Sequence, residues 1–442
     1  MNVRQLLDDR LSDAFERVCN ESAPALVSPA SRPEYGDYQS NGAMAVAKRL
    51  KTNPRKLAED IVNAADLTGI VAETEIAGPG FINLTLGQEF LSATLARPDL
   101  VTQVPRAERI VIDYSSPNLA KTLHVGHLRT TVIGDAMART LEILGHDVYR
   151  QNHIGDWGTP FGMLVTYLDE QGQSSDDLGN LDHFYALASQ RFEQDPSFAE
   201  AARNFVVDLQ SGKEAALTRW KQFIELSSSH MQHIYEQLNI SLKPDHIRGE
   251  SAYNNDLAQV VQDLDHAGLL SLSDGAKCVF LAEFTGKEGK PLPVLVQKSD
   301  GGYLYHTTDL AALRYRHNVL HADRILYFTD VRQNLHFRML FAVARAGEFV
   351  PKTTKLEHHP FGKLLDGDGR PFRSRDGSTI PLAKLVEQAH ERASALVRSK
   401  SSNLDQTEFD EVVHAIAIGA IKYADLSKNR LNDYQFDWDS ML

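Results

Sequence analysis

The chain has 442 residues, a length typical of about three domains. Of these residues 42% are hydrophobic and 24% charged, a composition typical of a globular protein. No apolar run is long enough to span a bilayer and the first residues mix charges into an apolar pattern, so membrane and secreted classes are excluded. The net charge of −13 argues against a protein that coats nucleic acid. Cys19 and Cys278 are too few for a disulfide framework, and we expect a reducing, cytoplasmic setting.

The first hundred residues predict a small α+β domain, which we place at 1–104. Apolar residues from Val3 to Val18 keep the three-to-four spacing of a helix. After Gly78-Pro79-Gly80, apolar and polar residues alternate from 81 to 86, as they do in a strand.

The next stretch predicts a βαβ unit. Ile110-Val111-Ile112 suits a parallel strand that is buried on both faces, and a polar loop follows it. A helical pattern starts at His124 and stops at Gly145, and Val148-Tyr149 begins another strand. The polar loop therefore lies at the carboxyl end of a parallel sheet, where ligands bind.

The rest of the chain completes an α/β fold and a helical stem. Residues from about 165 to 300 are more acidic and helical, and we interpret them as an insertion in a catalytic domain at 105–375. A strand pattern resumes at 324–328, and a glycine-rich loop follows it. Two amphipathic helices then predict a stem at 376–442.

The densest group of chemically active residues follows the buried strand. His124 and His127 are three residues apart at a helix start, where free N–H groups already favour phosphate. Lys121 would add positive potential, and Gly126 leaves room for a flat base or ribose against the backbone. Together they predict a site for a nucleoside triphosphate.

Two other functions are possible for such a stretch. A His-x-x-His pair can ligate a metal, but no third ligand has a recognisable spacing, and such a pair alone is more often structural. A dehydrogenase is disfavoured because no Gly-x-Gly-x-x-Gly follows the first strand.

The histidine stretch resembles the His-Ile-Gly-His signature of class I aminoacyl-tRNA synthetases, and its surroundings are similar to arginyl-tRNA synthetases in particular. Further matching segments run through the whole chain. They are 35–39 (Tyr-Gly-Asp-Tyr-Gln), 78–83 (Gly-Pro-Gly-Phe-Ile-Asn), 155–158 (Gly-Asp-Trp-Gly), 301–305 (Gly-Gly-Tyr-Leu-Tyr) and 424–430 (Ala-Asp-Leu-Ser-Lys-Asn-Arg).

The resemblance implies an arginine–tRNA ligase with a Rossmann-type catalytic domain. Its partners would be L-arginine, ATP with Mg²⁺, and tRNA(Arg). The N-terminal domain would contact the elbow of the tRNA, and the insertion would contact its acceptor end. We expect a monomer with no resident metal and no membrane association. Reaction would be two-step acyl transfer that needs positioning and charge stabilisation but no side-chain nucleophile.

The resemblance also implies the site residues. Arginine carries a permanent planar cation, so its pocket needs carboxylates and planar acceptors. The expected arginine-binding residues are Asp113, Ser115, Asn118, His153, Tyr305, Asp309 and Gln333. The expected ATP-binding residues are Leu123, Gly126, His127, Phe361 and Gly362. The expected catalytic residues are His124, His127, Lys121 and Arg373.

The second class I signature, Lys-Met-Ser-Lys-Ser, is degenerate in this chain. Its expected position holds Arg370-Pro371-Phe372-Arg373-Ser374-Arg375. Arg373 would clamp phosphate there, and Lys121 stands where a lysine is thought to compensate in this family. The alternative for the loop is a solvated basic segment without a catalytic role.

The family continues into a helical domain that reads the anticodon, whereas this sequence stops at Leu442, so we expect that domain to be lacking. The aromatic residues Tyr434, Phe436 and Trp438 are then either folded back on the core or exposed. Two rival functions follow. One is a truncated paralogue that transfers activated arginine to a non-tRNA acceptor, and the other is a non-catalytic arginine-sensing or RNA-binding relic.

Overall fold

The computed structural model describes residues 2–97, 101, 103–172, 181–286, 289–365, 369–370, 380–400 and 403–437. The chain forms two compact units, Met1–Pro105 and Arg106–Leu442. Within the described ranges no helix combines the length and apolarity needed to cross a membrane.

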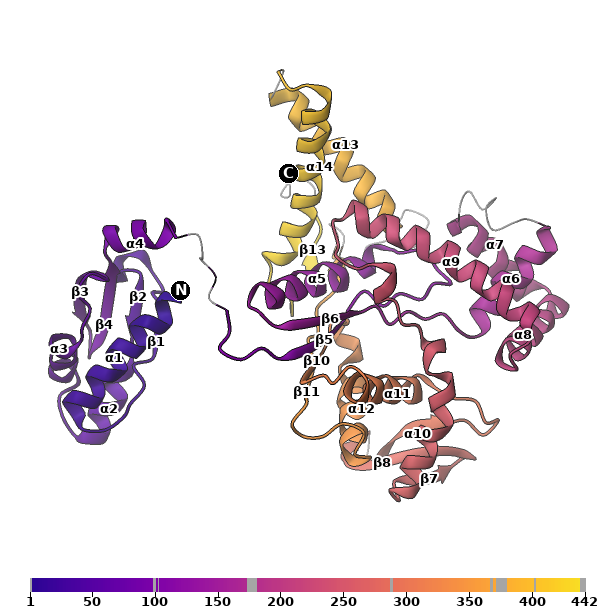
Figure 1. The fold of residues 1–442 in the computed structure, drawn as a ribbon, viewed down its shortest axis with the longest axis horizontal. Coiled ribbons are helices and arrows are strands. Elements are labelled where there is room, and N and C mark those ends of the chain that lie inside the picture. The colour runs from indigo at the N-terminus through magenta and orange to yellow at the C-terminus, as the bar shows by residue number, and fades with distance from the viewer. Residues whose placement is uncertain are drawn as a thin grey trace. The chain divides into compact units, whose positions relative to one another are not determined.

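The first unit is a four-stranded antiparallel sheet covered by helices (Figure 1). Its elements are α1 (Val3–Cys19), β1 (Val27–Pro29), β2 (Tyr38–Ser40), α2 (Gly42–Leu50), α3 (Pro54–Ala64), β3 (Val71–Ala77), β4 (Phe81–Leu86) and α4 (Gln88–Leu95). The strand order is β1-β2-β4-β3. Leu7, Leu11 and Phe15 on α1 are fully buried in the same core cluster as Ile82 and Leu84 on β4, so the helical and alternating patterns contribute to one core.

The second unit is built on a parallel sheet of order β11-β10-β5-β6. Its strands are β5 (Arg109–Asp113), β6 (Asp147–Gln151), β10 (Arg324–Tyr327) and β11 (Lys355–His358). Ile110, Val111 and Ile112 are fully buried because β5 is a central strand with packed layers on both faces. The parallel sheet confirms the α/β fold class.

Helix α5 (Leu128–Ile143) connects β5 to β6 and completes the predicted βαβ unit. Gly134 on α5 lies against the buried Tyr114, and a Cβ atom built on it would be 2.3 Å from the Tyr114 Cβ. The helix therefore packs more closely on the chain after β5 than any larger residue would allow.

The stretch predicted as a helical insertion contains both helices and strands. Its helices are α6 (Thr159–Gln171), α7 (Leu181–Gln194), α8 (Pro196–Gln210), α9 (Glu214–Gln237) and α10 (Asn254–His266). An antiparallel sheet of β7 (Leu270–Ser273), β8 (Ala276–Thr285) and β9 (Pro291–Gln297) follows. The helical prediction was therefore wrong for the strands within residues 270–297, where Val294 and Val296 on β9 alternate with more exposed neighbours and face α11 (Tyr305–Asn318).

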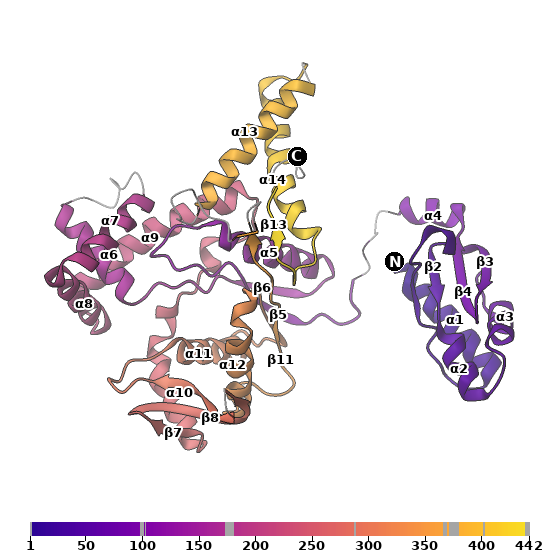
Figure 2. The ribbon, with the colours of Figure 1, turned by 180° about the vertical axis from the view of Figure 1, so that it is seen from behind.

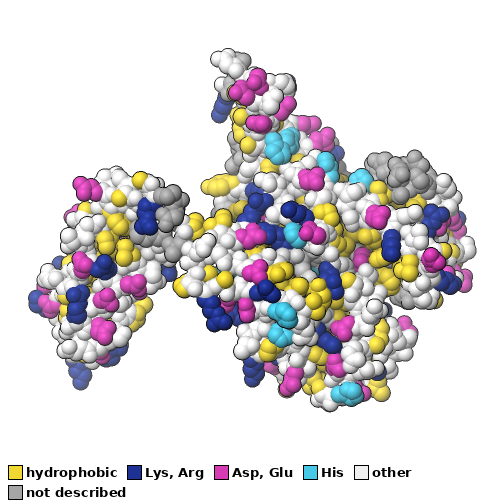
Figure 3. All heavy atoms as spheres, in the orientation of Figure 1, with side chains coloured by type: hydrophobic (Ala, Val, Ile, Leu, Met, Phe, Trp, Pro, Cys, Tyr) yellow, Lys and Arg dark blue, Asp and Glu magenta, His cyan; other side chains and the backbone are white. Residues whose placement is uncertain are grey.

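The last elements are α12 (Asn334–Ala346), β12 (Leu364–Leu365), α13 (Leu382–Lys400), α14 (Gln406–Leu426) and β13 (Tyr434–Gln435). Helices α13 and α14 lie side by side and project from the sheet, as Figures 1 and 2 show. The chain then returns, and β13 pairs with β12. Tyr434 and Phe436 are buried in the same core as α5 and the sheet, so these two aromatic residues fold back; Trp438 lies outside the described residues. Acidic and basic side chains are interspersed over the face in Figure 3.

Candidate active site

The polar loop after β5 leaves the sheet through two residues in the left-handed region, Ser115 (φ 68°) and Ser116 (φ 45°). Such values strain a residue with a side chain and persist only where neighbours hold them. Here the Ser115 amide donates to Thr130 Oγ1 at 3.1 Å, and the Ser116 amide donates to Asn152 Oδ1 at 2.9 Å. The loop is therefore fixed by both α5 and the end of β6.

His124 precedes a short 3₁₀ turn (Val125–His127) that leads into α5, His127 is the last residue of that turn, and the two ring centroids are 4.0 Å apart. The Gly126 amide donates to His124 Nδ1 at 3.1 Å, and the His124 amide donates to His127 Nδ1 at 3.2 Å. Burial and the neighbouring His124 lower the pKa of His127 to about 3. His127 is thus neutral, and its proton is on Nε2 because Nδ1 accepts a hydrogen bond.

A cavity of about 740 Å³ opens beside this histidine pair. It is formed by the helix start, the ends of β5 and β10, α11, α12 and the segment 361–364. The expected site residues on its wall are Ser115, His124, Gly126, His127, Tyr305, Asp309, Gln333, Phe361 and Gly362. Residues from positions 115–127 and from positions 305–362 therefore line one cavity.

Other expected residues lie elsewhere. Lys121 and Leu123 line a second cavity of about 250 Å³ against α9 and the start of α13. Asn118 Oδ1 accepts from the Ala120 amide at 2.9 Å and closes the turn of the loop. Arg373 lies outside the described residues.

The buried carboxylates are already supported by protein groups. Arg316 Nη2 donates to Asp113 Oδ2 at 2.5 Å, and Ser116 Oγ donates to Asp113 Oδ1 at 2.6 Å. His153 is buried, with Nε2 3.7 Å from Asp309 Oδ1, and burial lowers the pKa of His153. Asp309 faces the cavity, whereas Asp113 and His153 form the structure behind it.

Sequence reasoning missed three residues that shape this region: Arg316, His336 and Glu250. Burial and the charges of Asp309 and Asp156 raise the pKa of the Glu250 carboxyl to about 7. The shift shows that Glu250 lies in a region of negative charge near Asp309 and Asp156. No local signal marks Glu250, because it lies on a short turn (Glu250–Tyr253) far along the chain from Asp309.

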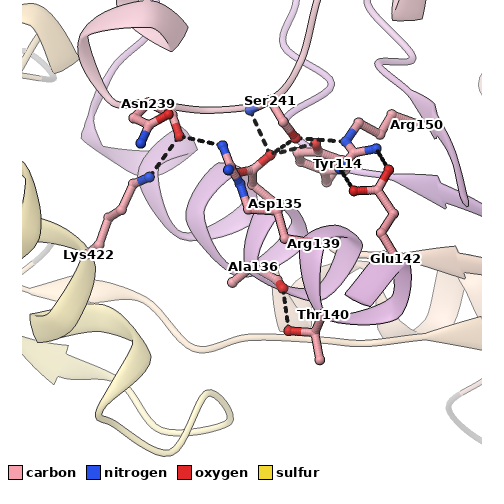
Figure 4. Close-up of polar contacts among 10 residues, drawn as sticks. All are labelled: Tyr114, Asp135, Ala136, Arg139, Thr140, Glu142, Arg150, Asn239, Ser241 and Lys422. Carbon is pink, nitrogen blue, oxygen red and sulfur yellow. Dashed lines mark hydrogen bonds and ion pairs between the residues drawn. The ribbon is translucent and has the colours of Figure 1, made fainter. Parts of the chain in front are cut away.

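A polar network holds the outer face of α5 (Figure 4). The buried Asp135 accepts from Tyr114 Oη at 3.0 Å, the Ser241 amide at 2.8 Å and Arg139 Nε at 2.8 Å. Lys422 on α14 donates to the Asn239 carbonyl at 2.9 Å. Residues 239–241, which follow α9, are therefore hydrogen-bonded both to α5, the helix after the histidine pair, and to α14.

The chain matches two families over nearly its whole length. Residues 91–438 match the family described as tRNA synthetases class I (R), catalytic domain. Residues 1–86 match the arginyl tRNA synthetase N terminal domain.

Similar proteins point the same way. The arginine–tRNA ligases of Chromobacterium violaceum and Hahella chejuensis are 50% and 49% identical, and each match covers 100% of this chain and 78% of the relative. The Plasmodium falciparum arginyl-tRNA synthetase structure has 28% identity and a TM-score of 0.78, covering 99% of this chain and 77% of that one. The Thermus thermophilus arginyl-tRNA synthetase, at 21% identity and a TM-score of 0.79 over 100% of this chain and 78% of that one, has the same fold. The chain therefore belongs to the arginyl-tRNA synthetase family.

Proposed function

We propose that the 740 Å³ cavity joins L-arginine to ATP and passes the arginyl group to tRNA(Arg), as an arginine–tRNA ligase. The supporting observation is that the histidine pair, of which His127 is neutral, and the carboxylate Asp309 line the same cavity. One end suits a phosphate and the other suits a cation.

In the first step, an arginine carboxylate oxygen forms a bond to the α-phosphorus of ATP, and the bond to the leaving pyrophosphate oxygen breaks. His124 and His127 would donate hydrogen bonds to phosphate oxygens as charge shifts toward pyrophosphate. The backbone at Phe361 and Gly362 would bind the adenosine. Lys121 and Arg373 remain proposed contributors to phosphate binding, and Lys121 would have to swing out of the second cavity to act there.

For the amino acid, we assign the guanidinium chiefly to Asp309, with Tyr305 and Gln333 on the same cavity wall. Glu250 is close enough to Asp309 for the two charges to interact, and we assign it a supporting role. Tyr305 is 69% exposed, so a bound arginine would cover part of its ring. Asp113 already pairs with Arg316, which neutralises its charge, so we assign it a supporting role behind Asp309. Asn118, Ser115 and His153 are proposed to fix the α-amino and α-carboxylate end.

Mg²⁺ would enter as the ATP complex and neutralise the leaving pyrophosphate. Among the described residues, no three carboxylate, imidazole or thiol groups gather in a way that would hold a resident ion. We also propose a cytoplasmic monomer. Sedimentation of the purified chain and cell fractionation would test these two points.

In the second step, a ribose hydroxyl of the terminal adenosine of tRNA attacks the arginyl carbonyl and AMP leaves. Arginine-dependent exchange of pyrophosphate into ATP, with and without tRNA(Arg), and charging of tRNA(Arg) test the proposal together. We expect exchange and charging. Exchange without charging would favour a different acceptor, and the absence of both would overturn the function.

A further inference from the structure

Arg129 is a buried cation on the wall of the cavity, in the first turn of α5. Its side chain is 1% exposed and lies only two residues after His127. Its guanidinium donates four hydrogen bonds: to the carbonyls of Gly362 (2.6 Å), Asn432 (3.0 Å) and Arg430 (3.3 Å), and to Asp425 Oδ1 (3.2 Å).

These contacts fasten two distant segments to each other. The Gly362 amide donates to the Arg430 carbonyl at 2.8 Å, and the Tyr434 amide donates to the Lys363 carbonyl at 3.1 Å. The Arg129 guanidinium also lies 5.7 Å from the Phe361 ring and 5.1 Å from the Tyr434 ring. Segments 361–365 and 430–436 thus form one ribbon, with Arg129 at its centre.

The two paired segments leave no space for a side chain at position 362. A Cβ atom built there would lie 2.5 Å from the Asn432 carbonyl carbon and oxygen. Asp425 is fully buried, and its second oxygen, Oδ2, has no hydrogen-bond partner, so Arg129 is its charge partner. A planar guanidinium can donate to several carbonyls and a carboxylate at once, whereas a lysine ammonium is a compact point charge on a flexible stem.

We propose that Arg129 is a positioning residue for the nucleotide, because it sets the backbone of Phe361–Lys363 on the same cavity wall that begins with the histidine pair. This inference rests on the proposed function. One helix start would then hold the two phosphate-facing histidines and also fix the distance to the segment that receives the adenosine. ATP affinity would depend on a residue that makes no contact with ATP.

The test compares Arg129→Lys with the parent chain by titration calorimetry for ATP and by pyrophosphate exchange. We expect ATP to bind about tenfold more weakly, because several charge-assisted bonds are lost, while the KM for arginine changes less than about twofold. If Arg129 only stabilised the fold, Arg129→Lys would lower the fraction of active protein and leave the KM for ATP and the KM for arginine unchanged. That result would overturn the inference. Failure of the parent chain to bind ATP would instead overturn the proposed function.

Asp425→Asn is the matched control, because it removes the charge partner and keeps the shape and the three carbonyl bonds. We expect it to lower thermal stability and to weaken ATP binding less than Arg129→Lys does; an equal loss of ATP affinity would contradict the inference. If Arg129→Lys fails to fold, hydrogen exchange on the parent chain gives an independent test. Saturating ATP should slow exchange at the amides of Gly362 and Tyr434, and unchanged exchange there would overturn the inference.

Discussion

His336 Nε2 lies 2.7 Å from Asp309 Oδ2 and joins α12 to α11 at the edge of the cavity. Burial alone would raise the pKa of Asp309, but the hydrogen bond from His336 and the nearby His153 outweigh it, so this pKa lies below its usual value. His306 packs on His336 with ring centroids 4.4 Å apart, and burial lowers the pKa of His306 to about 4. The cavity therefore presents an ionised Asp309 carboxylate that is hydrogen-bonded to His336.

Replacing His336 by alanine should weaken L-arginine more at pH 6 than at pH 8. Without the donated hydrogen bond, burial raises the pKa of Asp309, and its charged form is partly lost at the lower pH. Titration calorimetry at both pH values measures this, and His336→Gln, which keeps a side-chain N–H, is the control. Equal losses at pH 6 and pH 8 would show that His336 does not maintain the charge.

Asp309→Asn should weaken arginine by about 2–4 kcal/mol, because a cation in a desolvated pocket loses its charged partner. The parent chain should activate lysine and citrulline far less well than arginine. Lysine lacks the planar fork, and citrulline has the plane without the charge. Pyrophosphate exchange with each amino acid measures both effects, and comparable exchange with citrulline would defeat the assignment of Asp309.

His127→Ala should slow adenylation by about 10²–10³-fold while arginine affinity stays nearly constant, since the imidazole acts mainly on charge that develops in the transition state. The pKa of about 3 adds a stability effect. Because the folded-state pKa lies below the ordinary 6.5, the unfolded chain binds more protons between these values, and stability is lost as pH falls from about 6.5 toward 3. Urea unfolding at several pH values should show a shallower acid slope for the variant.

Glu250 should release a proton when arginine binds near pH 7. Its carboxyl has a pKa of about 7 because burial and Asp309 disfavour the charge, and a nearby guanidinium would favour it again. Calorimetry in buffers of different ionisation enthalpy should detect this release, and arginine affinity should rise from pH 6 to pH 8. Glu250→Gln should abolish the release. Glu283→Gln, at an exposed position on β8, is the control and should keep it.

Gly134→Ala should destabilise the second unit by about 3 kcal/mol, because its Cβ would overlap the Tyr114 side chain in a packed core. Gly419→Ala is the matched control: this glycine is also inside a helix, α14, and a Cβ there meets nothing within 4 Å. We expect the control to stabilise by up to about 1 kcal/mol through helix propensity. Urea unfolding compares the two, and equal effects would contradict the packing argument.

Local patterns were enough to predict the βαβ unit and the position of the histidine pair. The run Ile110–Ile112 and the helical spacing after His124 report burial within single elements. The helix was predicted from His124, whereas α5 begins at Leu128 after the 3₁₀ turn Val125–His127. The same patterns misjudged residues 270–297, because short half-buried strands next to helices give a weak period.

Only the tertiary structure decided which side chains meet. Asp113 and Arg316 are 203 residues apart in sequence, and Arg129 and Asp425 are 296 apart, yet each pair is in hydrogen-bond contact. The sequence also could not predict which cavity Lys121 lines. The loop before α5 separates the 740 Å³ cavity from the 250 Å³ cavity, and Lys121 lies on the side of the smaller one. Such contacts depend on how sheet, insertion and stem pack in three dimensions, and the spacing of residues along one element carries no information about that packing.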